Sequence, residues 1–147
     1  MKPEQSNREH RTASVSERIT GEMTTRTLVL ANAALEVATG LALIAAPGFG
    51  VHLLLGADLS SPGITVGRFT GLALLSMGLA CWPNKPEATS QVTWALFTYN
   101  LLVAVYLLYV RFGEGYNGPL LWPACVLHSS LTLLQARPAI VRLRLAV

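Results

Sequence analysis

Four polar side chains interrupt the long apolar runs of this sequence: Glu36, Arg68, Asn100 and His128. Each lies in a different run, so a helical fold would present them from different helices. Ionisable groups at membrane depth cost several kcal/mol and persist mainly where they are partnered inside a helix bundle. An acid, two bases and an amide brought together could hold a ligand or an ion, relay protons, or pair with one another to fix the helix register.

The composition indicates that these residues lie in a membrane protein. The chain has 147 residues, of which 52% are hydrophobic and 13% charged, whereas about 25% of residues are charged in an average soluble domain. Residues 1–26 hold nine charged side chains, and residues 27–136 hold only seven. A soluble globule needs charge spread over its whole surface.

Four apolar runs predict an all-α, antiparallel four-helix transmembrane bundle, with spans at about 27–46, 64–82, 91–110 and 119–136. Each is close to the roughly 20 residues that a helix needs to cross a hydrocarbon core of about 30 Å. The first run carries Glu36 in its middle and is too long for the apolar part of a signal peptide. Pro47-Gly48-Phe49-Gly50 ends it, and residues 51–56 are too short to span, which favours an interfacial or re-entrant turn.

The two ends of the chain are polar or basic. We expect residues 1–26 to form a flexible polar cytoplasmic tail, with Met23 as an alternative start of the protein, and residues 137–147 to form a basic interfacial tail. One side of the predicted bundle would hold nine Lys/Arg: five in the first tail, Lys85 and three arginines in the last tail. The other side would hold Arg111 alone. The positive-inside rule then predicts that both termini are cytoplasmic.

The spacing within the spans places three of the four polar residues at one depth. Glu36 and Asn100 each lie nine residues into their spans, about 13 Å from the cytoplasmic edge at 1.5 Å per residue. His128 lies nine residues into the last span from the opposite face, again near the midplane. Arg68 lies about 6 Å below the outer edge, from where its long side chain could reach down or extend to the interface.

Helical spacing also predicts which faces turn inward. In the last span a polar stripe lies on one side and should face the bundle interior: Cys125, His128, Ser129, Thr132 and Gln135. Asn32 and Glu36 are i, i+4 neighbours with Gly40 on the same face. Gly67 and Gly71 form a small-xxx-small pair that permits close helix approach. Tyr99, Val103, Tyr106 and Val110 form an apolar and aromatic stripe of the core or the lipid-facing surface.

Several kinds of chemistry have no support in the sequence. It contains no Gly-x-Gly-x-x-Gly, no Walker A loop, no His-Glu-x-x-His and no nucleophile elbow. We therefore predict no catalytic residues, no cofactor and no metal site, and no nucleic-acid partner either, because the basic residues form no dense patch. Cys81 and Cys125 lie at different depths, too far apart for a disulfide.

Seven short pieces of the sequence carry a resemblance: Glu36-x-x-x-Gly40, Pro47, Leu54-Leu55-Gly56, Arg68-x-x-Gly71, Tyr99-Asn100, Leu121-Trp122-Pro123-Ala124 and His128. Over about residues 28–136 the chain resembles a group of small four-span bacterial membrane proteins of uncharacterised function. The Arg-x-x-Gly start of the second span is also similar to the DoxX-like four-helix proteins. The resemblance implies a four-helix bundle in a bacterial inner membrane and no particular reaction.

Two functions fit these expectations, and an enzyme is the less favoured third. The first is a non-enzymatic membrane protein whose polar pocket binds a small lipid-like or quinone-like ligand, or docks a membrane partner. Glu36 would be the proton acceptor, Arg68 its counter-ion, His128 the titratable hydrogen-bonding group and Asn100 the orienting amide. The alternative is a small proton-coupled transporter that uses Glu36 and His128, which would need a homo-oligomer because four spans are few for a solute pathway. A buried pair that only fixes helix register accounts for the same residues equally well.

Overall fold

The computed structural model describes the backbone of residues 3–83 and 89–146, and the side chains of residues 20, 21, 23–83 and 91–136. Within these residues all regular structure is helical, in five helices: α1 (Pro3–Ala45), α2 (Pro47–Leu55), α3 (Ser61–Ala80), α4 (Thr89–Phe112) and α5 (Leu121–Ala146). Lys85, which contributed to the expected charge asymmetry, lies outside the described residues.

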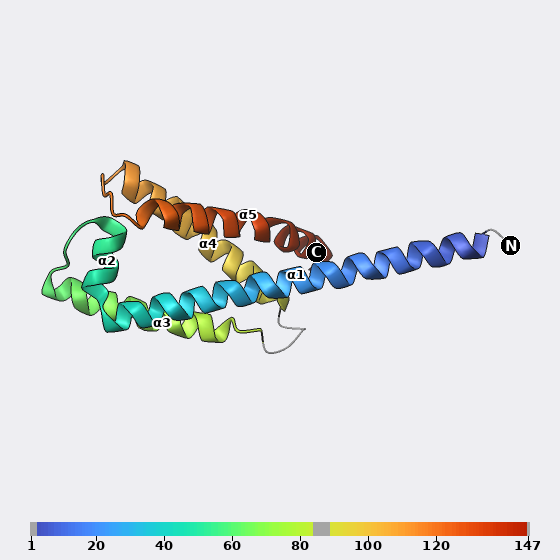
Figure 1. The fold of residues 1–147 in the computed structure, drawn as a ribbon, viewed down its shortest axis with the longest axis horizontal. Coiled ribbons are helices and arrows are strands. Elements are labelled where there is room, and N and C mark those ends of the chain that lie inside the picture. Colours follow the sequence, from blue (N-terminus) through green and yellow to red (C-terminus); the bar gives the residue numbers. More distant parts are fainter. Residues whose placement is uncertain (1–2, 84–88, 147) are drawn as a thin grey trace.

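Helix α1 is longer than the first apolar run and includes most of the segment that we expected to be a flexible tail. It is continuous over 43 residues, and its N-terminal half projects beyond the other helices (Figure 1). No proline lies between Pro3 and Pro47, so nothing forces the chain out of the helix. At the point where the helix enters the bundle, the hydroxyls of Thr24, Thr25 and Thr27 each donate to the carbonyl four residues earlier, at 2.9 Å.

Helix α2 takes the place of the expected turn after the first span. Pro47 lies in its first turn, where the missing N–H costs no helical hydrogen bond. Gly56 ends it in the left-handed region at φ +73°, and its N–H donates to His52 O. The chain then turns back through residues 57–60, and Ser60 caps α3 by accepting a hydrogen bond from the Gly63 N–H at 3.3 Å.

The long helices form two antiparallel hairpins that lie against each other (Figure 1). Helix α1 packs along α3, and α4 packs along α5. The first hairpin touches the second through α1, which contacts both α4 and α5, and through α2, which contacts α5. Among the described residues, the backbone of α3 approaches neither α4 nor α5, although Met77 of α3 packs against the cluster that contains Leu96 of α4. The interior of the bundle is therefore formed by α1, α4 and α5.

Glycines set the contact between α1 and α3. Gly67, Gly71 and Gly78 are the buried residues of α3. A Cβ built on Gly78 would lie 2.7 Å from the Ala33 carbonyl oxygen, and one built on Gly67 would lie 2.9 Å from the Pro47 side chain. The close approach expected of Gly67 and Gly71 is confirmed: Gly71 and Gly78 meet the α1 backbone, whereas Gly67 meets Pro47 at the start of α2.

The segment between α4 and α5 is joined to the end of α2. The Asn117 N–H donates to Leu55 O at 3.3 Å, and the Leu120 N–H donates to Leu53 O at 2.9 Å. Gly118 is buried between them, where any side chain would meet the α2 backbone. An apolar cluster lies directly beneath this contact: Leu107, Val110, Leu121 and Cys125, with Leu54 and Leu55 packed against them.

Three helical segments are long and apolar enough to cross a membrane: Met23–Ala45, Ser61–Ala80 and Gln91–Phe112. They match the first three expected spans closely. Large apolar side chains also cover the outside of the bundle, among them Leu41, Val66, Phe69, Leu72, Leu102 and Val105. Three apolar helices of this length, with large apolar side chains on the outer surface, are typical of a membrane protein.

Helix α5 extends past the expected end of the fourth run. It continues through Arg137-Pro138 to Ala146, so residues 137–146, expected as an interfacial tail, belong to the helix. Proline fixes φ near the helical value and removes only one hydrogen bond, which long membrane helices tolerate.

Candidate functional site

A hydrogen bond between α1 and α4 lies at the centre of the bundle. The Tyr99 hydroxyl donates to Glu36 Oε2 at 3.0 Å. Glu36 is 2% exposed, and its other oxygen, Oε1, is buried without a hydrogen-bond partner. Asn32 lies one turn away on the same face of α1 and is fully buried.

A second hydrogen bond joins α4 to α5 at the same level. His128 Nδ1 lies 2.7 Å from Asn100 Oδ1, and Asn100 Nδ2 donates to Leu96 O at 2.8 Å. A backbone carbonyl can only accept, so the Asn100 amide is oriented with its oxygen toward the histidine. Nδ1 must then carry the proton, which leaves Nε2 of the neutral ring with its lone pair.

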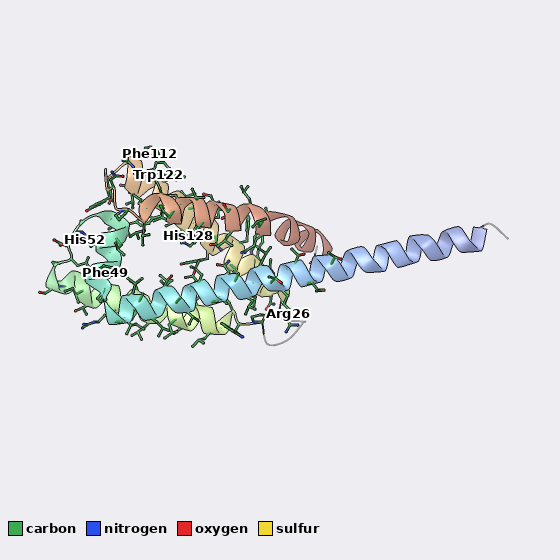
Figure 2. The ribbon with its side chains drawn as sticks, in the orientation of Figure 1. Arg26, Phe49, His52, Phe112, Trp122 and His128 are labelled. Atoms are coloured by element: carbon green, nitrogen blue, oxygen red, sulfur yellow. The ribbon has the colours of Figure 1, made fainter. Side chains whose placement is uncertain are left out.

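Tyr99 connects the two hydrogen bonds. Its ring meets the His128 ring edge to face, with centroids 6.0 Å apart. Glu36, Tyr99, Asn100 and His128 therefore form one group, here called the polar layer, drawn from three helices. In Figure 2, His128 lies on the side of α5 that faces α1.

Arg68 is not part of the polar layer. It is exposed on α3, next to the buried Gly67, which faces Pro47 at the start of α2. Among the described residues no ion pair links it to Glu36. The structure thus brings Glu36, Asn100 and His128 together and leaves Arg68 outside.

Three further residues of this region were not among the predicted site residues: Tyr99, Asn32 and Gln135. Tyr99 precedes Asn100 and so lies at the same level, but it had been grouped with the apolar stripe that continues to Val110. Gln135 belongs to the polar stripe of the last span, and the structure buries it completely. These residues could have been found in the sequence by including every polar side chain on the predicted inward faces of the helices, and not only the ionisable ones.

Five buried polar atoms near the polar layer have no hydrogen-bond partner: both polar atoms of Asn32, both of Gln135 and Glu36 Oε1. Buried polar atoms without partners are rare in proteins, because each one costs about 1–3 kcal/mol. These atoms provide donors and acceptors for a guest molecule. Asn32, Gln135 and Glu36, together with Asn100, are the buried amide and carboxylate side chains among those described here.

The described side chains include no group of three or more His, Cys, Asp or Glu that could hold a metal ion. Cys81 and Cys125 are both buried and both free, as their positions in the sequence predicted. At the far end of the bundle, His52 lies exposed 3.0 Å from Asp58, away from the polar layer.

Comparisons with protein-family models, curated proteins and solved structures give no match to this chain.

Proposed function

We propose that this protein is a four-span, non-enzymatic membrane protein whose polar layer binds a small ligand with a polar head and an apolar body, such as a quinone-like or lipid-like molecule. The observation that carries the proposal is the free Oε1 oxygen of Glu36, buried in the same group as the Tyr99 hydroxyl and the His128 ring. A head group with a hydroxyl or carbonyl can hydrogen-bond to a carboxyl and to an imidazole nitrogen. Its apolar body would lie among the surrounding helices, as is usual for ligand sites of this kind.

The fourth span in this proposal is α5. Its outward residues are large and apolar, with Val126, Leu133 and Leu134 more than half exposed, and it packs antiparallel to α4, which is itself long and apolar enough to span. The end of α5 lies at the end of the bundle opposite α2, and the N-terminal half of α1 projects beyond that same end (Figure 1). We place this end in the cytoplasm of a bacterial cell, on the inner membrane, because the basic residues of the sequence gather there.

The ligand can be sought directly in purified protein. Wild type, Glu36→Gln, His128→Ala and the control Ser76→Ala would be purified in mild detergent, extracted with organic solvent and analysed by mass spectrometry. Ser76 is exposed on α3 and bonds only to its own helix, at Leu72 O. A stoichiometric molecule in wild type and Ser76→Ala, lost from the other two variants, would support the proposal. No such molecule in folded wild type would contradict it.

Proton-coupled transport is the second candidate, favoured by the series of titratable groups Glu36, Tyr99 and His128 across three helices. Vesicles that contain a pH-sensitive dye would distinguish it. Proton flux that is present in wild type and absent in Glu36→Gln, with no bound ligand in either, would favour transport over binding.

A further inference from the structure

Buried polar side chains are distributed on one side of the polar layer only. Asn32 and Thr25 on α1, Thr93 on α4 and Gln135 on α5 all lie between the layer and the end of the bundle that holds both termini. On the other side, toward α2, the buried side chains are apolar: Pro47, Ala104, Leu107, Val110, Leu121 and Cys125. The exception at that end is Arg111 in the last turn of α4, which is half-buried and whose Nε is buried without a hydrogen-bond partner.

Asn32 and Gln135 lie at similar heights on neighbouring helices. Asn32 is four residues from Glu36, and Gln135 is seven residues from His128, which corresponds to about 6 Å and 10 Å along the bundle axis. Because α1 and α5 are antiparallel and in contact, both displacements run in the same direction. Side chains tilt toward the N-terminus of their own helix. The Gln135 amide therefore leans back toward the polar layer and the Asn32 amide leans away from it, so the two converge.

The two amides need partners that the described residues do not supply. Both side chains are fully buried, and none of their four polar atoms has a hydrogen-bond partner. Water is the smallest molecule that donates and accepts in every direction, and buried water commonly makes about three such bonds to otherwise unpartnered groups. The other unpartnered buried atom on this face of α1 is Glu36 Oε1, one turn from Asn32.

The α2 end offers no comparable route. Two backbone hydrogen bonds, from Asn117 to Leu55 and from Leu120 to Leu53, fasten the α4–α5 segment to α2. Beneath them lies the apolar cluster of Leu107, Val110, Leu121 and Cys125. Water there would lose its hydrogen bonds, since no buried amide accompanies this cluster. On the other side of the polar layer the apolar cluster of Val29, Ala33 and Leu96 is accompanied by the buried amides of Asn32 and Gln135.

We propose that Asn32 and Gln135 hold a chain of water molecules that links Glu36 to the end of the bundle where both termini lie, so that Glu36 exchanges protons with that side of the membrane only. The titratable groups that face Glu36 are Tyr99 from α4, His128 beyond Tyr99 on α5 and Cys81 at the end of α3, beside Ala33. From α2 none reaches it, since His52 is exposed and lies against Asp58. The inference rests on the membrane placement proposed above, but not on the ligand.

Silver ions, which are small enough to follow a water chain and cross lipid poorly, test the route and its side. Asn32→Cys and Gln135→Cys would each be made in a Cys81→Ala/Cys125→Ala background, with Ala104→Cys as the matched control. Ala104 is buried on α4 one turn from Asn100, on the dry side. The full-length variants would be placed in vesicles, their orientation scored by protease cleavage of the N-terminal end of α1, and the unreacted thiols counted after denaturation.

We expect the thiols of Asn32→Cys and Gln135→Cys to react when silver is added on the side of the termini. Their reaction should be at least about tenfold faster than that of Ala104→Cys, a factor that corresponds to 1.4 kcal/mol. No reaction at either position in folded protein, equal reaction at Ala104→Cys, or reaction from the α2 side would overturn the proposal. Silver reacts without any ligand, so a failed search for a ligand would not affect this result. A failed silver test would likewise leave the ligand proposal open to its own test.

Hydroxyl-radical footprinting tests the same route in the unmodified protein, independently of whether the cysteine variants fold. Leu131 is buried one turn from Gln135 on α5, and Leu121 is buried at the α2 end of the same helix. Radicals generated from bound water would oxidise Leu131 and spare Leu121. An unoxidised Leu131 would contradict a water chain at this position.

Discussion

Gly40 and Gly71 lie so close together that neither has room for a β-carbon. One built on Gly40 would lie 2.7 Å from the Gly71 carbonyl oxygen, and one built on Gly71 would lie 2.7 Å from the Gly40 carbonyl oxygen. The relationship is reciprocal, as expected where two antiparallel helices cross backbone to backbone. In lipid such packing replaces the hydrophobic effect as the force that holds helices together. The position of Glu36, one turn from Gly40 on α1, depends on it.

Gly40→Ala should therefore destabilise the protein. The added methyl would also lie 2.6 Å from the Leu75 backbone nitrogen, so α1 and α3 must separate. We expect the free energy of unfolding to fall by about 1–3 kcal/mol, the usual cost of overpacking. It would be measured by unfolding in mixed detergent micelles. Gly48→Ala is the control, since nothing lies within 4 Å of the added atom, and an equal loss there would contradict the argument.

Tyr99→Phe should cost stability without changing the shape of the core. The substitution removes only the hydroxyl that donates to Glu36 Oε2, which leaves both carboxyl oxygens without partners. We expect a loss of about 1–3 kcal/mol in the free energy of unfolding, the penalty for an unpartnered buried polar group. Tyr106→Phe is the matched control on the same helix, because Tyr106 is 61% exposed.

The same pair can be examined by a double-mutant cycle. In a Glu36→Leu background the hydroxyl has lost its acceptor, so Tyr99→Phe should cost at least about 1 kcal/mol less than it does in wild type. Equal costs in both backgrounds would show that the hydroxyl stabilises the protein through some other contact.

The protonation state of the His128 ring should be visible by nitrogen NMR. The orientation of Asn100, fixed by its bond to Leu96 O, requires the proton to be on Nδ1. The imidazole nitrogen shifts of neutral His128 should report this tautomer in wild type, and Asn100→Ala should shift the population toward the Nε2-protonated form, the usual preference of a free ring. An Nε2-protonated ring in wild type would mean that Asn100 is oriented the other way. The exposed His52 serves as the internal reference.

Arg68→Gln should leave the polar layer unchanged. Arg68 is exposed on α3, so its charge lies outside the group that holds Glu36. We expect the amount of any co-purified ligand to equal that of wild type, while Glu36→Gln loses it. Loss of the ligand from Arg68→Gln would restore Arg68 as the counter-ion that the sequence suggested.

The level of each polar residue could be predicted from the sequence, because helix rise is constant. Counting residues from the span ends placed Asn100 and His128 at one depth, and the structure joins them by a hydrogen bond. The lengths of the apolar runs likewise predicted the three segments that can cross a membrane. Both arguments depend only on distances along a helix axis.

The rotation of each helix was harder to predict. Arg68 follows Gly67, so once the glycines of α3 face α1, a step of about 100° turns Arg68 away from the bundle interior. Hydropathy alone does not favour the glycine face over the arginine face. Tyr99 shows the opposite error, because it was left out of the predicted site and lies in it. It belongs to an apolar stripe, yet its hydroxyl donates to Glu36. The helix over residues 3–26 was missed because that segment has no apolar stripe, although it also has no proline after Pro3.

The join between α2 and the α4–α5 segment has a consequence for the order of folding. Gly56 ends α2, and the carbonyls of Leu53 and Leu55 in its last turn are then free to accept hydrogen bonds from Leu120 and Asn117. The two carbonyls are held in this position only after α2 has formed. The ribosome also makes Asn117 about sixty residues after Leu55. We therefore expect the hairpin of α1 and α3 to form while α4 and α5 are still being made, and the second hairpin to dock onto the end of α2 afterwards.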